Sequence, residues 1–505
     1  MAPFFTNNSC NPFLPQDEPC TVGNYVAYAV NASNIHDIQV TVKFARERNI
    51  RLTIRNTGHD YNGKATGAGA IAVWTHYMKS MGTMNYTGST YAGMALKFGA
   101  GVQTGEAYQY AHDRGLVIVG GNVPSVGLAG GYTQGGGHSP LSSILGLAAD
   151  QALEWEVVTA EGDHLTASPT QNSDLYWALS GGGGGTYAIA TSLTVKAHKD
   201  LMNSAANLTF SSEGASEDSF WNVVETFQVS LPSIVDAGAV AVFSLTNESF
   251  TLGPLQGPGL SKAHLEQLLG PTISRLKKEN IKYNFLVDEY PTFYDSYKSY
   301  DPPVNVSQYQ IGGRLIPRTL VQKNISALVS AERSILGSGS VAFISGVCVN
   351  VSVTDPTMNS VNPIWRTSLF DAVVATPFSY MNPESNIAFA DMTTHKFLPL
   401  LEALTPSGGA YLNEADFQQP DFQSTLYGPN YQRLRSIKSR YDPDDMFYAV
   451  TAVGSEDWFE DQSRGGCSIR GLIAGKRFWA KSLQSLGTGF ISSLKTVFAE
   501  EKAGQ

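Results

Sequence analysis

Arg55-Asn56-Thr57-Gly58-His59-Asp60-Tyr61-Asn62-Gly63 is the stretch around which this chain is organised. It directly follows a strand-like run, residues 50–54, so a short turn carries a single histidine between two glycines. A glycine backbone lets a ligand approach closely, because no side chain stands in the way. The stretch therefore predicts a strand that ends in a binding turn built around His59.

Length and composition predict a globular protein of several lobes. The chain has 505 residues, too many for one hydrophobic core, so we expect two or three lobes. Its 42% of hydrophobic and 15% of charged residues are typical of a folded protein. A net charge of −10 without a basic stripe argues against nucleic acid, and no apolar run reaches the ~18 residues of a membrane span. We expect neither nucleic acid nor membrane as a partner, and a monomer.

Cysteines and sequons predict the compartment. Cys10 and Cys20 lie close together in a Pro/Asn-rich segment, which suits a small disulfide loop. Asn-x-Ser/Thr sequons occur at Asn7, Asn31, Asn85, Asn207, Asn247, Asn305, Asn324 and Asn350. No apolar signal segment precedes residue 10, so either the signal peptide is not present in this sequence or the chain is not secreted. We favour a secreted mature chain.

Residues 24–197 alternate between extended and helical patterns, which argues for a compact lobe of mixed α and β structure. Strands are predicted before residue 34 and at residues 50–54, 94–102, 116–119, 152–159 and 187–195, and residues 67–72 lead into an extended run at 73–74. Helices are predicted at residues 34–47, 104–114 and 174–179.

From about residue 200 to 405 the glycines thin out, and the pattern predicts a second lobe, an antiparallel sheet with helices on one face. Its predicted strands include 205–210, 238–245 and 341–353, and its helices include 217–229, 262–279 and 320–336. Residues 411–454 then change character, with a helical stretch at 428–440. Residues 476–498 have the spacing of an amphipathic helix, to which we assign no function.

Several familiar motifs are incomplete in this chain. Residues 58–64 fit the phosphate-binding pattern G-x-x-x-x-G-K, with Lys64 as its lysine, but Ala65 stands where a serine or threonine would hold magnesium. Residues 67–72 fit the dinucleotide pattern G-x-G-x-x-A, but a strand follows where a helix is required. Residues 137–141 lack the last glycine of a nucleophile elbow. With no H-E-x-x-H and no paired C-x-x-C, we expect no metal.

Glycines gather in three segments of the first lobe, residues 55–63, 120–137 and 181–185. Backbone N–H groups in such loops form anion-binding nests without any lysine, which suits a pyrophosphate in an acidic protein. The alternative is that the glycines only mark turns and close packing. Three such loops in one lobe favour a ligand site.

Four stretches together carry a family resemblance: residues 55–63, 120–142 (GGNVPSVGLAGGYTQGGGHSPLS), 174–195 (DLYWALSGGGGGTYAIATSLTV) and 411–458, which begins YLNEAD. The chain resembles the berberine-bridge-enzyme-like branch of the vanillyl-alcohol-oxidase (PCMH-type) flavoprotein superfamily, in particular its fungal members. The resemblance implies an α+β fold of two lobes, an FAD-binding α+β lobe and a substrate lobe with an antiparallel sheet and helices.

The resemblance also implies a division of the chain into five parts. They are an N-terminal segment (1–23), an FAD-binding domain (24–200), a substrate domain (201–410), a berberine-bridge-type segment that returns to the FAD lobe (411–458) and a C-terminal tail (459–505).

The resemblance implies that FAD is bound covalently, with His59 joined to the 8α-methyl carbon of its isoalloxazine. That role needs a nucleophilic ring nitrogen held rigidly, which a turn anchored at both ends supplies. The alternative is a histidine that only forms hydrogen bonds in a tight turn. Many relatives form a second link through a cysteine, but Val123 occupies that position, and valine cannot form a thioether. We therefore expect a single covalent link, through His59.

Val126 matches the position where oxygen-reactive members usually carry valine, which favours O2 as the electron acceptor. The alternative is an ordinary packing valine. His138 is interpreted as structural or adjacent to the cofactor. The resemblance places these further residues at the cofactor: Arg55, Asn56, Thr57, Gly58, Asp60, Asn122, Gly127, Gly130, Gly131, Gly184, Ile189, Tyr427 and Asn430.

Glu414 and Tyr61 are the candidate catalytic residues. In many relatives a tyrosine in a Y-x-N-Y-x-D motif takes a proton from the substrate, and Glu414 stands at that position in YLNEAD. A carboxylate is a ready proton acceptor at neutral pH. Either Glu414 is the base or it only pairs with a neighbouring residue. The resemblance places Tyr61 near the reactive face of the flavin.

These expectations combine into a secreted FAD-dependent oxidase that oxidises an alcohol, a carbohydrate or a secondary metabolite with O2 to give H2O2. One alternative is an FAD-dependent oxidative cyclase or dehydrogenase of a fungal biosynthetic pathway. Another is a flavin-binding protein of weak activity, because the cysteine and the usual tyrosine are missing. No motif in residues 200–405 identifies the small-molecule substrate.

Overall fold

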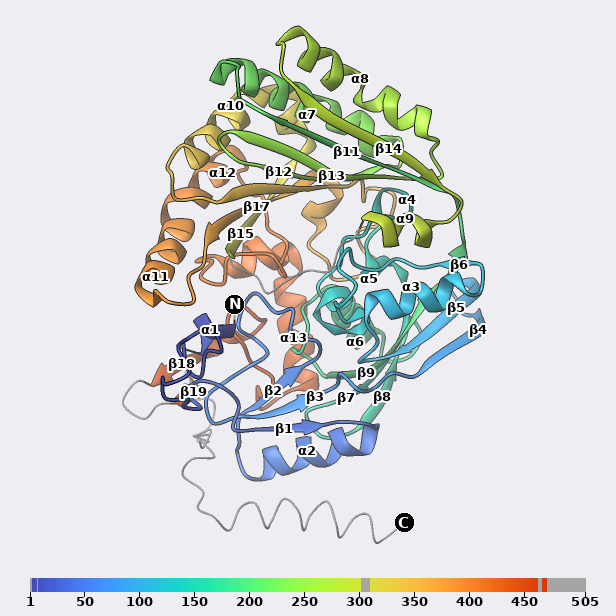
Figure 1. The fold of residues 1–505 in the computed structure, drawn as a ribbon. Helices are drawn as coiled ribbons and strands as arrows, with labels where there is room; N and C mark the ends of the chain where they lie inside the picture. The colour runs from blue at the N-terminus through green and yellow to red at the C-terminus, as the bar shows by residue number, and fades with distance from the viewer. Residues whose placement is uncertain (1, 7, 301–308, 462–465, 470–505) are drawn as a thin grey trace.

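The computed structural model describes residues 2–6, 8–300, 309–461 and 466–469 and shows two stacked lobes (Figure 1). The first lobe lies below the second in Figure 1, and the chain returns to it after residue 410. The amphipathic helix predicted at 476–498 lies outside the described residues. Within the described part of the chain, no helix has both the length and the apolar character that a membrane span requires.

The first lobe is built on two main sheets. A parallel sheet has the strand order β1-β3-β2, and an antiparallel sheet has the order β4-β5-β9-β7-β8. The strands are β1 (Tyr28–Asn31), β2 (Leu52–Arg55), β3 (Ile71–Trp74), β4 (Met81–Thr87), β5 (Ala92–Gly99), β6 (Leu116–Val117), β7 (Ala152–Val158), β8 (His164–Ala167), β9 (Ile189–Lys196) and β10 (His198–Lys199). The helices are α1 (Ala2–Phe5), α2 (Ile35–Glu47), α3 (Thr104–His112), α4 (Ser142–Leu145), α5 (Ala148–Gln151) and α6 (Ser173–Leu179).

Helix α2 shows how the sequence sets local structure in this lobe. Asn34 caps its N-terminus, because the side-chain oxygen accepts a hydrogen bond from the backbone N of Asp37 (3.1 Å). Ile38, Val42 and Ala45 recur at helical spacing and are buried in one cluster with the strands of the parallel sheet. The helix thereby covers the sheet from which the turn around His59 emerges.

The second lobe is a seven-stranded sheet in the order β14-β11-β13-β12-β16-β17-β15, antiparallel at every step. The strands are β11 (Asn203–Ser211), β12 (Val240–Leu245), β13 (Ser249–Pro258), β14 (Tyr283–Tyr290), β15 (Tyr309–Pro317), β16 (Phe343–Cys348) and β17 (Ser368–Pro377). The helices are α7 (Glu217–Asp236), α8 (Lys262–Lys278), α9 (Phe293–Tyr300), α10 (Arg318–Leu336), α11 (Pro383–Met392) and α12 (Leu398–Leu404). Helices α7, α8 and α10 lie above the sheet in Figure 1, away from the first lobe. The α+β fold of two lobes expected from the sequence is confirmed.

Several predicted boundaries differ from the structure; the helix predicted at 217–229, for example, continues to Asp236. Two further differences have a local cause. The strand predicted at 341–353 ends at Cys348, because residues 349–362 leave the sheet and cross to the first lobe. There the backbone N of Asn350 donates to Ser143 Oγ (3.0 Å). The helix predicted from residue 428 begins with a 3-10 turn, Gly428–Asn430, and continues as α13 (Tyr431–Tyr441), because Gly428 has a φ of +56°, outside the α-helical region.

The segment after residue 410 is fastened to the first lobe. Lys438 on α13 is fully buried, and its Nζ donates to the backbone oxygens of Phe447 (2.7 Å) and Thr186 (3.1 Å) and pairs with Asp442. Thr186 adjoins the glycine-rich loop 181–185, so Lys438 fixes the turn around Phe447 against that loop. The hairpin β18 (Trp458–Asp461) and β19 (Gly466–Ile469) follows.

The N-terminal segment packs over the outer side of the His59 turn. The disulfide expected between Cys10 and Cys20 is present. The Phe5 ring lies so close to Gly63 that a Cβ there would be 2.5 Å from it. Phe5 also packs edge-on against Phe417 of the returning segment, with ring centroids 5.2 Å apart. The turn is therefore held from both sides.

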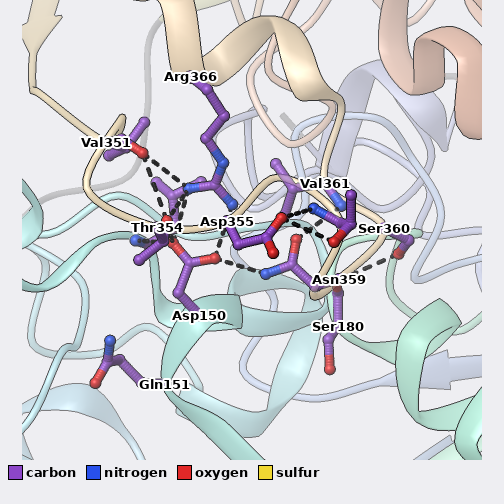
Figure 2. Close-up of polar contacts among 12 residues, drawn as sticks. Asp150, Gln151, Ser180, Val351, Thr354, Asp355, Asn359, Ser360, Val361 and Arg366 are labelled. Atoms are coloured by element: carbon purple, nitrogen blue, oxygen red, sulfur yellow. Dashed lines mark hydrogen bonds and ion pairs between the residues drawn. The ribbon is translucent and has the colours of Figure 1, made fainter.

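A buried polar network joins the crossing segment of the second lobe to the first lobe (Figure 2). Arg366 Nη2 and Nη1 donate to Asp150 Oδ1 (2.7 Å) and Oδ2 (2.8 Å), and the exposed fractions of the two side chains are only 7% and 1%. Asn359 Nδ2 and Thr354 Oγ1 also donate to Asp150, at 2.6 and 2.9 Å. The backbone N of Leu147 in the first lobe donates to the same carboxylate (2.8 Å). Because the three side-chain partners all come from residues 354–366, this carboxylate is a point at which the second lobe is anchored.

Replacing Arg366 by methionine is expected to destabilise the protein strongly. Arg366→Met leaves the Asp150 carboxylate buried without its cation, which costs about 3–5 kcal/mol for a buried ion pair. Urea unfolding of the full chain measures the loss. Arg318→Met is the control, because its ion pair with Asp236 is partly exposed and pairs of that kind contribute about 1 kcal/mol or less. Equal losses in both variants would contradict the anchoring role of Asp150.

The buried Glu332 predicts a pH dependence of stability. Burial raises the pKa of this carboxyl from 4.5 to about 8, although a hydrogen bond from Gln228 opposes the shift. Between these values the unfolded chain loses its proton while the folded chain keeps it, so stability falls as the pH rises through this window and levels off above about pH 8. Glu332→Gln has no proton to lose and is expected to flatten the profile, whereas Glu213→Gln, at an exposed position, is not. Unfolding at pH 5, 6.5 and 8 tests this; parallel profiles for wild type and Glu332→Gln would refute it.

Candidate functional site

A cleft of about 290 Å3 opens between the turn after β2, two glycine-rich loops of the first lobe and the returning segment. The loops are residues 121–134 and 184–185, and the returning segment contributes residues 411–414 and 447–449. Stretches more than 350 residues apart in sequence therefore form one site. Its walls are described below from the His59 turn outward.

His59 lies on the wall of the cleft, with its Nε2 2.8 Å from Ser125 Oγ. The side chain is exposed to the cleft, yet the surrounding protein desolvates it and lowers the pKa of the imidazole. A histidine with a lowered pKa is neutral at pH 7. Because Ser125 occupies Nε2, Nδ1 is the nitrogen left to react.

The glycines of the loops are required by close backbone packing. Asn56 Nδ2 donates to Thr75 Oγ1 (2.9 Å) and to the backbone oxygen of Ala100 (2.5 Å), which fixes the side chain beside Gly127. A Cβ on Gly127 would lie 1.8 Å from Asn56 Oδ1. A larger residue at Gly127 would therefore displace Asn56 and the start of the His59 turn with it.

The 181–185 loop is supported by the second lobe. The backbone N of Ser360 donates to the backbone oxygen of Ser180 (3.0 Å). Gly181 has a φ of +122°, and a Cβ there would lie 2.3 Å from the backbone N of Val361. Gly181 is therefore the residue that lets Val361 pack against the loop, and docking of the second lobe helps to shape the first-lobe site.

Glu414 and His138 form a pair in the cleft. His138 Nε2 lies 2.9 Å from Glu414 Oε1, and both side chains are largely buried. Asn413 Nδ2 holds the segment in place by donating to the Tyr411 hydroxyl (2.8 Å) and the backbone oxygen of Gly131 (2.9 Å). The pairing expected as one alternative for Glu414 is therefore present, with His138 as the partner.

Asp371 lies behind this pair. It is a fully buried residue of β17, and neither carboxylate oxygen has a hydrogen-bond partner among the described residues. Burial, and then the nearby charge of Glu414, raises the pKa of Asp371 well above its ordinary value. The Asp371 carboxyl is therefore held in its neutral, protonated form next to the Glu414–His138 pair.

The structure brings most of the predicted site residues together. Those that line the cleft are Asn56, Thr57, Gly58, His59, Asp60, Tyr61, Asn122, Val123, Val126, Gly127, Gly130, Gly131, His138, Gly184 and Glu414. Four do not line it. The Arg55 guanidinium folds back onto Gly58, and Ile189 is buried in a hydrophobic cluster beside β2. Tyr427 donates to the backbone oxygen of Thr451, and Asn430 to those of Ser360 and Val361, so both support the walls from behind.

Sequence reasoning missed several residues of the site. Ser125 lies within the second glycine-rich segment but was given no role, and residues 447–449 carry no motif. Asp371 left one signal, because it is the only acid in the otherwise apolar run Leu369–Ala375. Lys64 was considered only as part of an incomplete phosphate motif, yet it lines the cleft.

Comparison with known proteins agrees with this fold and cleft. Residues 26–168 match the family model "FAD binding domain", and residues 410–454 match "Berberine and berberine like". The FAD-linked oxidoreductase sor8 of Hypocrea jecorina is 45% identical over 470 residues, 93% of this chain and 82% of the relative. The crystal structure of the VAO-type flavoprotein MtVAO615 from Myceliophthora thermophila C1 is 40% identical, with a TM-score of 0.87 over 91% of this chain and 85% of that chain.

A more distant structure shares only the fold. It is glucooligosaccharide oxidase from Acremonium strictum, described with 6-S-cysteinyl, 8α-N1-histidyl FAD, which is 18% identical with a TM-score of 0.70 over 86% of this chain and 93% of that chain. Fold and cleft together define a flavoprotein of the vanillyl-alcohol-oxidase type. The chain belongs to the berberine-bridge-like family of FAD-linked oxidoreductases, and it is an oxidoreductase.

The cleft has the chemistry that FAD requires. Among the described residues, Asn122 Oδ1, Gln134 Oε1 and His138 Nδ1 are buried and have no hydrogen-bond partner, although all three residues line the cleft. Leaving such atoms unpaired costs about 1–3 kcal/mol each, so a ligand with complementary polar groups is favoured. The N–H and carbonyl groups of an isoalloxazine and the hydroxyls of its ribityl chain match them in kind. Within the described ranges no cluster of His, Cys, Asp and Glu is suited to a metal ion.

Proposed function

We propose that this protein is an oxidase that holds FAD through one covalent bond to His59 and transfers electrons from a small-molecule substrate to O2. The observation that carries the proposal is that a neutral histidine and the 2.9 Å Glu414–His138 pair open into the same cleft. His59 supplies the covalent anchor of the cofactor. The Glu414–His138 pair supplies a site for proton transfer beside it.

His59 has the properties of a nucleophile. Its lowered pKa keeps the ring neutral, and the Ser125 contact at Nε2 directs Nδ1 to the bond. This choice of nitrogen agrees with the N1-histidyl link named for the glucooligosaccharide oxidase. Val123 lines the cleft and offers no sulfur, which supports a single link.

The Glu414–His138 pair supports the oxidation step. FAD, when bound, would supply the acceptor for a hydride from the substrate carbon and the electron pair that reduces O2. Glu414 accepts the proton that leaves the substrate oxygen or nitrogen, and His138 Nε2 holds the carboxylate in position. Tyr61 lies on the same cleft, where its side chain orients the substrate. Val126 lines the cleft as well, which supports O2 as the acceptor.

The proposal includes secretion as a monomeric glycoprotein. The Cys10–Cys20 disulfide supports an oxidising compartment. Sequon asparagines Asn31, Asn85, Asn247 and Asn324 are exposed, as glycan attachment requires. Protein purified from its native host is expected to lose mass when it is treated with a glycosidase. An unchanged mass would contradict the proposed glycosylation.

The covalent link predicts the mass of the denatured protein. The wild-type chain is expected to carry the added mass of one FAD, because His59 Nδ1 forms the bond, and His59→Ala is expected to lose it. His76→Ala, which removes a histidine that does not line the cleft, is the control and keeps the added mass. Mass spectrometry of the denatured protein measures the added mass. A wild-type chain without added mass would refute the covalent link.

Glu414→Gln is expected to slow flavin reduction about 10²–10⁴-fold, because the amide cannot accept the substrate proton. The rate is measured anaerobically by flavin bleaching, with whichever alcohol, sugar or polyketide of a test panel reduces the wild type. Glu248→Gln, at an exposed position, should leave the rate unchanged. An unaltered rate in Glu414→Gln would mean that Glu414 only pairs with His138.

The fate of the electrons distinguishes the oxidase from its nearest alternative. Peroxide formed in proportion to the substrate consumed identifies an oxidase. Slow reaction with O2 combined with fast reduction of a dye would identify a dehydrogenase or oxidative cyclase instead.

A further inference from the structure

Lys64 follows the His59 turn and lines the same cleft. Of the described residues that line the cleft, it is the only lysine or arginine, and the acidic ones are Asp60 and Glu414. The two histidines supply no free cation: His59 is neutral, because burial lowers its pKa, and His138 contacts Glu414. Lys64 is therefore the only full positive charge that the described lining of the cleft offers to an anionic ligand.

The charge of Lys64 is not used by its neighbours. Asp60, the nearest acid in the turn, is occupied by the backbone: Oδ1 accepts from the N of Asn62 (2.9 Å) and Oδ2 from the N of Ala65 (2.7 Å). Lys64 Nζ makes no hydrogen bond or ion pair with any described residue. Desolvation by burial lowers the pKa of Lys64, and the charge of Asp60 opposes this shift. Among the described residues, the ammonium thus has no direct ion-pair or hydrogen-bond partner.

We propose that the Lys64 ammonium binds the diphosphate of FAD, an inference that rests on the flavin site proposed above. The backbone N–H groups of glycine-rich loops give directional hydrogen bonds to phosphate oxygens, but they carry only partial charge. A lysine supplies a compact full charge on a flexible stem, which suits a phosphate group without requiring a fixed orientation. Without Lys64 a dianionic group would meet a cleft that contains two carboxylates and no cation.

The sequence around Lys64 lacks two parts of a phosphate-binding loop, the residue that holds magnesium and the helix. Residues 58–64 reproduce the spacing of a phosphate-binding loop, but Ala65 lacks the hydroxyl that would hold magnesium. No helix follows, so no helix N-terminus points at the phosphates as it would in such a loop. The lysine and the loop N–H groups therefore replace both the metal and the helix.

Binding of nucleotide fragments to the full chain in a His59→Ala background tests the contact. This background removes the proposed covalent link, so bound FAD can be removed and ligands exchange. Calorimetry gives the dissociation constants of ADP and adenosine, and their ratio isolates the contribution of the phosphates. We expect Lys64→Gln to reduce the preference for ADP about 10–100-fold, the size of a hydrogen bond to a charged group. Lys64→Arg is expected to keep most of the preference.

Lys323→Gln is the matched control, because it removes the same charge from an exposed position on α10. It is expected to leave the preference unchanged. An unaltered preference in Lys64→Gln, or no binding of ADP by the folded His59→Ala protein, would overturn the inference. Lys64→Met replaces Lys64→Gln if the latter does not fold, as judged from the unfolding midpoint. None of these measurements uses turnover, so a protein that forms no peroxide would refute the oxidase proposal and leave the Lys64 result intact.

Discussion

The backbone of the 181–185 loop touches that of residues 130–131, and the cleft depends on this contact. A Cβ on Gly184 would lie 2.7 Å from the Cα of Gly131, closer than real side chains come. On the other side of the loop Val361 packs against Gly181 at a distance that likewise excludes a Cβ. Three segments from two lobes meet here because glycine alone permits backbones to approach so closely. The N–H groups of the loops consequently lie beside the cleft instead of beneath side chains.

The cofactor site and the proposed proton acceptor belong to different parts of the chain, so their relative position depends on docking of the lobes. The Asp150–Arg366 network anchors the crossing segment, and Ser360 carries the contact on to the 181–185 loop. Lys438 anchors the returning segment to the same loop through Thr186. A buried ion pair of this kind contributes little net stability compared with apolar packing, but it is costly to break. It therefore specifies one arrangement of the lobes.

Burial sets the charge states along the cleft. His59 and Asp371 are both driven toward their neutral forms, one by loss of a proton and the other by retention of one. The charges that remain are the carboxylate paired with His138 at one part of the cleft and the Lys64 ammonium at another. This separation suits the proposed function, because FAD is anionic at its diphosphate and the proposed oxidation releases a proton at the substrate.

Local patterns were enough to predict much of the fold. The spacing of apolar residues predicted α2 within one residue and α10 within two at its start, because the periodicity of a buried helix face is written in consecutive residues. Local patterns also misplaced some element ends, such as that of α7, and one failure occurs where a segment leaves its sheet for another lobe. Residues 349–353 look like a strand, but the backbone N of Asn350 donates to Ser143 of the first lobe, a competition that no local window contains.

The sequence by itself determined the turn around His59, the glycine-rich loops and the valine at position 123, because these depend on residue identity and short-range geometry. Only the tertiary structure decided that His138 is the partner of Glu414, 276 residues away, that Ser125 contacts His59, and that Asp371 and Lys64 belong to the site. The physical reason is that a contact between distant segments is selected by the packing of two whole lobes. The residues of one segment alone do not determine which side chain of a distant segment will contact it.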